Sequence, residues 1–144
     1  IIAIAVGISY GMGYGDNTAA MLITRGMAEM SRMVVACGGQ ALTCMGLAGA
    51  GDMVATCMSK HSRNRRFGEE YVAAGKTLAD FEADTHMVVE GALACKTIEV
   101  LAKEHDVELP ISDAVREVVW GGADVHEVGK LLASRPLTTE FYGI

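Results

Sequence analysis

The sequence predicts an all-α fold in which residues 1–144 form one helical domain. Hydrophobic residues make up 51% of the chain and aromatic residues only 6%, a balance that favours closely packed helices over a β-sandwich. Apolar residues also recur at three- and four-residue steps, the spacing of one helix face. A chain of 144 residues is long enough for a single core but short for two. We therefore expect one helical bundle.

The clearest helix is expected between Asp16 or Asn17, either of which can cap its start, and the glycine pair at 38–39. It follows residues 1–10, which are apolar enough for a buried helix or strand, and a glycine-rich turn at 11–15. Its charged side chains fall opposite the apolar stripe and are expected to form a solvated face; they are Arg25, Glu29 and Arg32.

Shorter helices are expected along the rest of the chain, where periodic segments alternate with turn residues. Ser112 or Asp113 can cap the helix that follows Pro110, and Asp124 can cap the last one, before a loose tail after Pro136. The longest of these helices is expected to turn four side chains inward, namely Leu93, Thr97, Val100 and Leu101. The expected helices cover residues 62–72, 77–81, 88–105, 112–120 and 124–134.

The composition argues against several classes of function. A net charge of −6 leaves no extended positive surface, so neither nucleic acid nor an anionic membrane is an expected partner, and no apolar segment is long enough for a membrane span. The four cysteines form no C-x-x-C pair and no zinc-finger spacing with histidine, so we expect buried free thiols, no metal site and a reducing, cytoplasmic location. No G-x-G-x-x-G pattern is complete, so a Rossmann cofactor site is not expected.

The densest polar feature is the segment 60–66, Lys-His-Ser-Arg-Asn-Arg-Arg, which places four cations in seven residues of an acidic chain. Guanidinium, hydroxyl and amide donors at the start of a helix are what a phosphate group requires, so a small phosphorylated ligand is one interpretation. The alternative is a solvated arginine face paired with Glu69 and Glu70. The residues alone leave both open.

Asp52 is the second candidate, because it is the one charge in the apolar and glycine-rich run 42–57. A carboxylate desolvated by such neighbours is costly unless it pairs with a cation or has a catalytic task. It could equally cap a helix at 53–58. Glu90 is an ordinary first-turn acid on its sequence alone, and the four histidines are scattered without ligand spacing.

Several sequence blocks together resemble the C-terminal domain of bacterial NAD(P)-dependent glycerol-3-phosphate dehydrogenases, over nearly the whole chain from Ile1 to about Ser134. The two most specific blocks are Gly-Leu-Ala-Gly-Ala-Gly-Asp at 46–52 and Ser-Arg-Asn-Arg-Arg-Phe-Gly at 62–68. The others are Gly-Asp-Asn at 15–17, Leu-Ile-Thr-Arg-Gly-Met-Ala-Glu-Met at 22–30, Thr-Cys at 56–57, Val-Val-Glu-Gly at 88–91 and Leu-Pro-Ile at 109–111. The fold implied is a helical bundle like the C-terminal domain of 6-phosphogluconate dehydrogenase.

The resemblance implies reversible hydride transfer between NAD or NADP and glycerol 3-phosphate, giving dihydroxyacetone phosphate, in phospholipid synthesis. By position, Asp52 and Thr56 match the catalytic group. The implied substrate-binding residues are Asp52, Ser62, Arg63 and Asn64. The implied cofactor-binding residues are Arg63, Val88 and Glu90. Arg65 and Arg66 are left as supporting charge.

The family's proton-donating lysine would fall just before Ile1, where the chain opens within an apolar run with no initiating Met or polar lead. We therefore expect this chain to be one half of a longer protein whose N-terminal domain holds most of the cofactor. Alone, the 144 residues are expected to be inactive. A homodimer is possible.

Three other interpretations remain open at this point. The chain could be the helical C-terminal domain of a different two-domain dehydrogenase, such as the 6-phosphogluconate or ketopantoate enzymes, although their motifs match poorly. It could be a non-catalytic module that binds RNA or DNA through residues 60–66, against which the net acidity and the absence of stacking aromatics argue. It could also serve only for packing or dimerisation.

Overall fold

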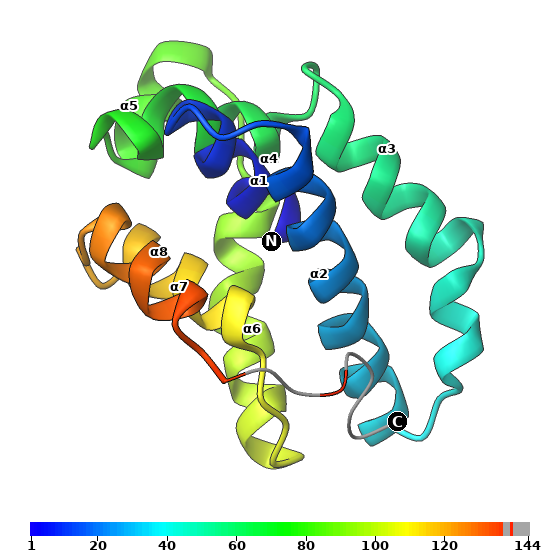
Figure 1. Ribbon diagram of the computed structural model, residues 1–144. Coiled ribbons are helices and arrows are strands. Elements are labelled where there is room, and N and C mark those ends of the chain that lie inside the picture. The colour runs from blue at the N-terminus through cyan, green and yellow to red at the C-terminus, as the bar shows by residue number, and fades with distance from the viewer. Residues whose placement is uncertain (137–138, 140–144) are drawn as a thin grey trace.

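The computed structural model describes residues 1–136 and residue 139, and every regular element among them is a helix (Figure 1), as the sequence predicts. The expected loose tail after Pro136 lies outside these residues, apart from Thr139. The α-helices are α1 (Ile2–Gly11), α2 (Asp16–Ala36), α3 (Asp52–Met58), α4 (Arg63–Arg66), α5 (Leu78–Thr85), α6 (Glu90–Glu104), α7 (Pro110–Val119) and α8 (Val125–Ala133). Short 3-10 or π-helical elements are η1 (Ala41–Met45), η2 (Leu47–Gly51), η3 (Phe67–Tyr71) and η4 (Val72–Ala74).

Helix α1 lies in the middle of the bundle, with α2, α3, α4, α6, α7 and η3 packed around it (Figure 1). Its residues from Ile2 to Ser9 are buried, because it is apolar on all sides and offers no polar face to water. Gly7 permits its closest approach, since a Cβ there would collide with the carbonyl of Arg65. The first ten residues, for which the sequence allowed a helix or a strand, are thus the central helix.

Helix α2 corrects one expectation, because of the three charged residues expected on its solvated face only Arg25 is exposed. Glu29 is 3% exposed, and its carboxylate accepts hydrogen bonds from the backbone N–H of Ile111 and from the N–H and hydroxyl of Ser112. Arg32 is buried as well and donates to the carbonyl of Glu108. The start of α7 docks on this face, so the face is an interior contact and not a solvated one.

The same contact corrects the expected cap of α7. The helix begins at Pro110, and the groups that receive its free N–H donors belong to Glu29 and not to Ser112 or Asp113. A carboxylate at a helix N-terminus is favoured by the positive end of the helix dipole. Burial nevertheless raises the pKa of Glu29, with the bonds from Ile111 and Ser112 acting in the opposite direction.

Residues 41–74 form short α-, 3-10 and π-helical elements in succession. The sequence instead predicts one continuous helix for residues 62–72. The expected helix at 62–72 is split into α4, η3 and η4, and a π-helical turn at η2 leads into α3. Glycine is frequent here, and Gly49 and Gly68 approach the carbonyls of Cys44 and Ile4 too closely for a Cβ. Glycines that serve such contacts weaken regular helix, which accounts for the mixed geometry.

Helix α6 turns its small side chains inward, contrary to expectation. Gly91, Ala92, Cys95 and Ala102 are buried, whereas Leu93 is 50% and Val100 56% exposed, and Thr97 and Leu101 are also exposed. Small residues let α6 pack closely against its neighbours, and this close packing outweighs the general tendency of larger apolar side chains to be buried.

Several other expectations at helix ends and for cysteines can be compared directly. Asp124 caps α8 by accepting hydrogen bonds from the N–H groups of His126 and Glu127, as expected. All four cysteines are free thiols. Three of them are buried, as expected, whereas Cys37 is exposed. Within the described part of the chain, no helix combines the length and the apolar character that crossing a membrane requires.

Candidate functional site

A cavity of about 460 Å³ lies where the start of α1, the middle of α2, α3 and the start of α4 meet. Three of the predicted site residues line it together: Asp52, Thr56 and Asn64. Its wall also includes Ile1, Glu29, Met53, Cys57, Leu109 and Ser112. The fold therefore gathers residues from several helices around one space large enough for a three-carbon phosphate ester.

Asp52 is the first residue of α3, and its side chain is exposed. It neither caps the helix nor sits desolvated, so both structural arguments made from its sequence are wrong. The reason is that its apolar neighbours are themselves at the surface, Leu47 being 90% and Val54 44% exposed. Its carboxylate makes no hydrogen bond or ion pair within the described residues, which leaves its oxygens available to a ligand.

Thr56 lies one helical turn after Asp52, so both side chains project from the same face of α3 toward the cavity. Its hydroxyl can donate and accept. The neighbouring Cys57 also lines the cavity, but burial raises the pKa of its thiol to about 11. It stays protonated at neutral pH and is therefore a poor nucleophile.

The segment 62–64 presents donors at the start of α4. The Ser62 hydroxyl accepts the N–H of Arg65 at 3.3 Å and keeps its own proton for donation. The Asn64 side-chain oxygen accepts the N–H of Gly91 at 2.9 Å. Because that oxygen is already engaged, the amide group that Asn64 offers to the cavity is its NH₂ donor.

The three arginines of the basic segment have different surroundings. Arg65 is buried and pairs with Glu69 at 3.0 Å, and Arg66 pairs with Glu70 at 3.1 Å on the surface. The interpretation as a solvated, paired arginine face therefore holds for Arg66, whereas for Arg65 the pairing is right and the solvation is wrong. Arg63 is exposed, is not part of the cavity wall, and forms no hydrogen bond or ion pair within the described residues. Among these three arginines it is the one whose guanidinium is free to meet an anion, and Lys60 is the other exposed and unpaired cation of the segment within the described residues.

Val88 and Glu90 lie at the start of α6, outside the cavity wall. Val88 is 48% exposed, and Glu90 is an exposed first-turn acid with no capping hydrogen bond. The Asn64–Gly91 hydrogen bond ties this end of α6 to α4. Val88 and Glu90, which are predicted to contact the cofactor, therefore lie on the open surface beside the segment 62–64.

Sequence reasoning missed two residues that hold the site together. Gly91 has no room for a Cβ, which would lie 2.5 Å from the Asn64 side-chain oxygen, and its place at the end of the Val-Val-Glu-Gly block was the available signal. Arg65 is buried and donates hydrogen bonds to the carbonyls of Cys57 and Met58 at the end of α3. No local sequence pattern distinguishes it from Arg63 or Arg66.

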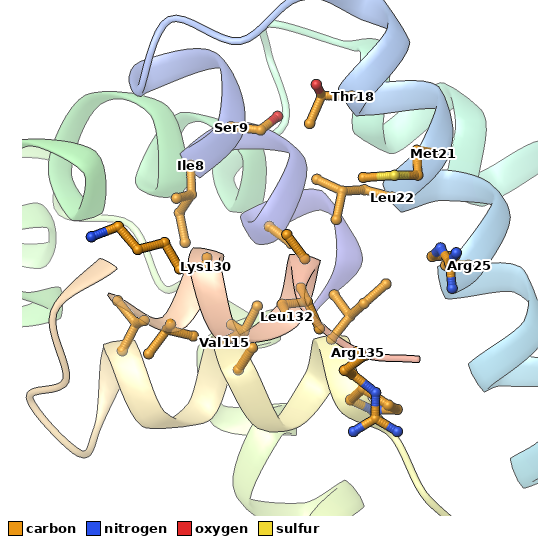
Figure 2. Close-up of a pocket in the computed structure, with 18 of the residues that line it drawn as sticks. Ile8, Ser9, Thr18, Met21, Leu22, Arg25, Val115, Lys130, Leu132 and Arg135 are labelled. Carbon is orange, nitrogen blue, oxygen red and sulfur yellow. The ribbon is translucent and has the colours of Figure 1, made fainter. Parts of the chain in front are cut away.

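A larger cavity of about 670 Å³ lies between α1, α2, α7 and α8. Figure 2 shows Ile8, Leu22, Val115 and Leu132 around it, and its lining is otherwise mainly apolar. None of the predicted site residues contributes to it. The described residues also contain no group of three or more His, Cys, Asp or Glu placed to hold a metal ion.

Comparison with known protein families identifies the family of this chain. The family described as the NAD-dependent glycerol-3-phosphate dehydrogenase C-terminus matches residues 1–130. The chain belongs to this family. The glycerol-3-phosphate dehydrogenase family is thus the one whose blocks the sequence resembles.

Individual members of the glycerol-3-phosphate dehydrogenase family agree in sequence and in fold. The chain is 49% identical to the glycerol-3-phosphate dehydrogenase (NAD(P)+) of Chlorobium limicola over 99% of its own length, and 48% identical to that of Nocardia farcinica over 94%. The crystal structure of the Coxiella burnetii glycerol-3-phosphate dehydrogenase superposes with a TM-score of 0.88 at 37% identity, over 93% of this chain. The chain spans 42%, 40% and 41% of these three proteins, respectively.

Proposed function

We propose that residues 1–144 form a single substrate-binding domain of an NAD(P)-dependent glycerol-3-phosphate dehydrogenase. The observation that carries the proposal is the shared cavity of Asp52, Thr56 and Asn64 in a chain of this family. The whole enzyme would interconvert glycerol 3-phosphate and dihydroxyacetone phosphate for phospholipid synthesis, in the cytoplasm and as a homodimer. The remaining part of the enzyme would be an N-terminal dinucleotide-binding domain.

The phosphate group of the substrate would be held by Ser62, Arg63 and Asn64. Arg63 supplies an exposed guanidinium, Ser62 a hydroxyl proton, and Asn64 an amide NH₂ whose direction is set by Gly91. All three are donors, which matches a ligand group that only accepts hydrogen bonds. Arg65 and Arg66 are already paired and would contribute no direct contact.

The reacting end of the substrate would lie against α3. Reduction of the ketone develops negative charge on oxygen and requires a positioned proton donor. In the family this donor is a lysine that would fall just before Ile1, and Ile1 lines the same cavity as Asp52 and Thr56. We assign to Asp52 the positioning and charge-balancing of that lysine, and to Thr56 a hydrogen bond beside the reacting carbon.

The nicotinamide cofactor would contact this domain through Arg63, Val88 and Glu90. Their exposure suits that role, because all three present side chains on the open surface next to the donors of residues 62–64. When bound, NAD or NADP supplies or accepts the hydride. The domain's own residues orient the substrate so that its reacting carbon faces the cofactor.

The proposal is tested by Asp52→Asn in a full-length dehydrogenase that carries this domain, assayed with dihydroxyacetone phosphate and NADH or NADPH. We expect kcat to fall about a hundredfold, because the amide keeps the shape but loses the charge that positions the proton donor. Asp106→Asn is the matched control, since Asp106 is exposed with φ 53°, a conformation that asparagine tolerates. Wild-type protein without this activity, or an Asp52→Asn variant as active as the control, would refute the proposal.

A further inference from the structure

Arg65 has more partners than any other side chain near the site. It is only 4% exposed, and one terminal nitrogen of its guanidinium donates to the carbonyls of Cys57 at 3.3 Å and of Met58 at 2.8 Å. Its Nε donates to Glu69 at 3.0 Å. The guanidinium carbon also lies 4.2 Å from the ring centre of Tyr10, whose hydroxyl donates to Asp16 at 2.6 Å.

Two of these partners belong to α3, one of the two helices that carry the site, and Arg65 itself belongs to the other. Cys57 and Met58 are the last residues of α3, the helix of Asp52 and Thr56, and their carbonyls are among those that a helix end leaves without an intrahelical partner. Arg65 itself lies in α4, next to Asn64 and two residues after Arg63. Its side chain therefore bridges the end of α3 to α4 across the connecting loop.

We propose that Arg65 is the positioning residue that fixes the donors of residues 62–64 relative to Asp52 and Thr56. The inference rests on the proposed function, since it assigns Arg65 a part in ordering that substrate site. Arg65 itself does not touch the substrate. It acts by holding two helix ends at one separation, so that the phosphate-binding and carbon-facing groups are in register before the ligand arrives.

The chemistry of arginine suits this role, and the neighbouring residue shows the difference. A planar guanidinium can donate to two carbonyls and a carboxylate at once while stacking on an aromatic ring, which a lysine ammonium cannot reproduce. Arg66 makes the same i to i+4 carboxylate pair, with Glu70, but lies at the surface and donates to no carbonyl of α3. Arg66 is thus an internal control for the ion pair without the bridge.

The test uses the full-length dehydrogenase and three variants. Arg65→Lys is expected to raise KM for dihydroxyacetone phosphate and lower kcat, with a combined loss in kcat/KM of roughly ten- to hundredfold, because small displacements of positioning groups are costly to catalysis. The KM for NADH should change much less. Arg66→Lys and Glu69→Gln should both stay within about twofold of wild type, since each leaves the carbonyl bridge in place.

Equal effects of Arg65→Lys and Arg66→Lys would overturn the inference, as would a Glu69→Gln variant that loses as much as Arg65→Lys. If Arg63→Ala impairs turnover while Arg65→Lys does not, the positioning role fails and the proposed function stands. If neither variant changes turnover, the proposed function fails as well.

A second measurement does not depend on the folding of any variant. In wild-type enzyme without substrate, the amides of Ser59, His61 and Ser62 are expected to exchange slowly with deuterium, because the bridge already orders the loop in which they are hydrogen-bonded. Fast exchange that slows only on addition of glycerol 3-phosphate would show that the ligand, and not Arg65, sets the loop conformation.

Discussion

The charged groups at the junction of α2 and α7 differ from those at the starts of α3 and α4 in how they are partnered. At the junction, Glu29 is buried and its carboxylate accepts three hydrogen bonds from the first turn of α7. At the starts of α3 and α4, Asp52 and Arg63 are exposed and make no hydrogen bond or ion pair within the described residues. Both regions carry charges of either sign, yet only the second leaves them available.

The contrast separates charges that are used up by contacts within the fold from charges that remain available to a ligand. A buried ion is tolerated when its neighbours satisfy it, and it then has no capacity left for a ligand. Glu29 contributes to the cavity wall but is fully engaged by α7. Asp52 and Asn64 line the same cavity and keep free hydrogen-bonding groups, so the groups that remain available to a ligand lie on the side of α3 and α4.

The largest effect on stability is expected at the junction. Glu29→Ala should lower the free energy of unfolding by about 3 kcal/mol, because it leaves two backbone N–H groups and a hydroxyl buried without acceptors. Unfolding in denaturant can be followed by the fluorescence of Trp120, the one tryptophan, which lies at the far end of α7. Glu104→Ala, at an exposed position, should change stability by less than about 0.5 kcal/mol. Equal values for the two variants would remove the distinction between the regions.

A smaller effect on stability is expected where α4 and the residue before α1 meet the start of α6. Gly91→Ala would place a Cβ 2.5 Å from the Asn64 oxygen and 3.0 Å from the nitrogen of Ile1, so Asn64 must move, at a cost of about 1–2 kcal/mol. Gly129→Ala in α8 meets nothing within 4 Å and should stabilise by about 0.5 kcal/mol. In the full-length enzyme only Gly91→Ala should raise KM for the phosphorylated substrate. An unchanged KM would mean that Asn64 does not bind it.

The sequence predicts the outline of this fold because the outline depends on local patterns. The three- and four-residue spacing of apolar side chains locates α2, and Asp124 marks the start of α8 through its capping side chain. The site blocks were identified from residue order, and Asp52, Thr56 and Asn64 do meet in one cavity. These features depend on residues near one another along the chain.

What the sequence does not predict depends on long-range contacts. Glu29 resembles a surface residue of an amphipathic helix until α7, more than eighty residues later, docks on it. The exposed Leu93 and buried Ala92 of α6 reverse the usual preference, because close approach of the helices favours small side chains. Arg65 is buried and Arg63 exposed because Arg65 packs against Tyr10 of α1 and donates to the end of α3. The pattern of residues around the two arginines does not reveal these contacts.

The most direct test concerns Arg63, an exposed charge that makes no hydrogen bond or ion pair within the described residues. Arg63→Ala in the full-length enzyme is expected to raise KM for dihydroxyacetone phosphate and to lower kcat, reducing kcat/KM about a hundredfold, because a held phosphate both anchors and orients the reacting carbon. Arg25→Ala, an exposed arginine that lines the larger cavity, should leave both constants near wild type. Unchanged kinetics for Arg63→Ala, or an equal loss for Arg25→Ala, would contradict the assignment of the substrate site to α3 and α4.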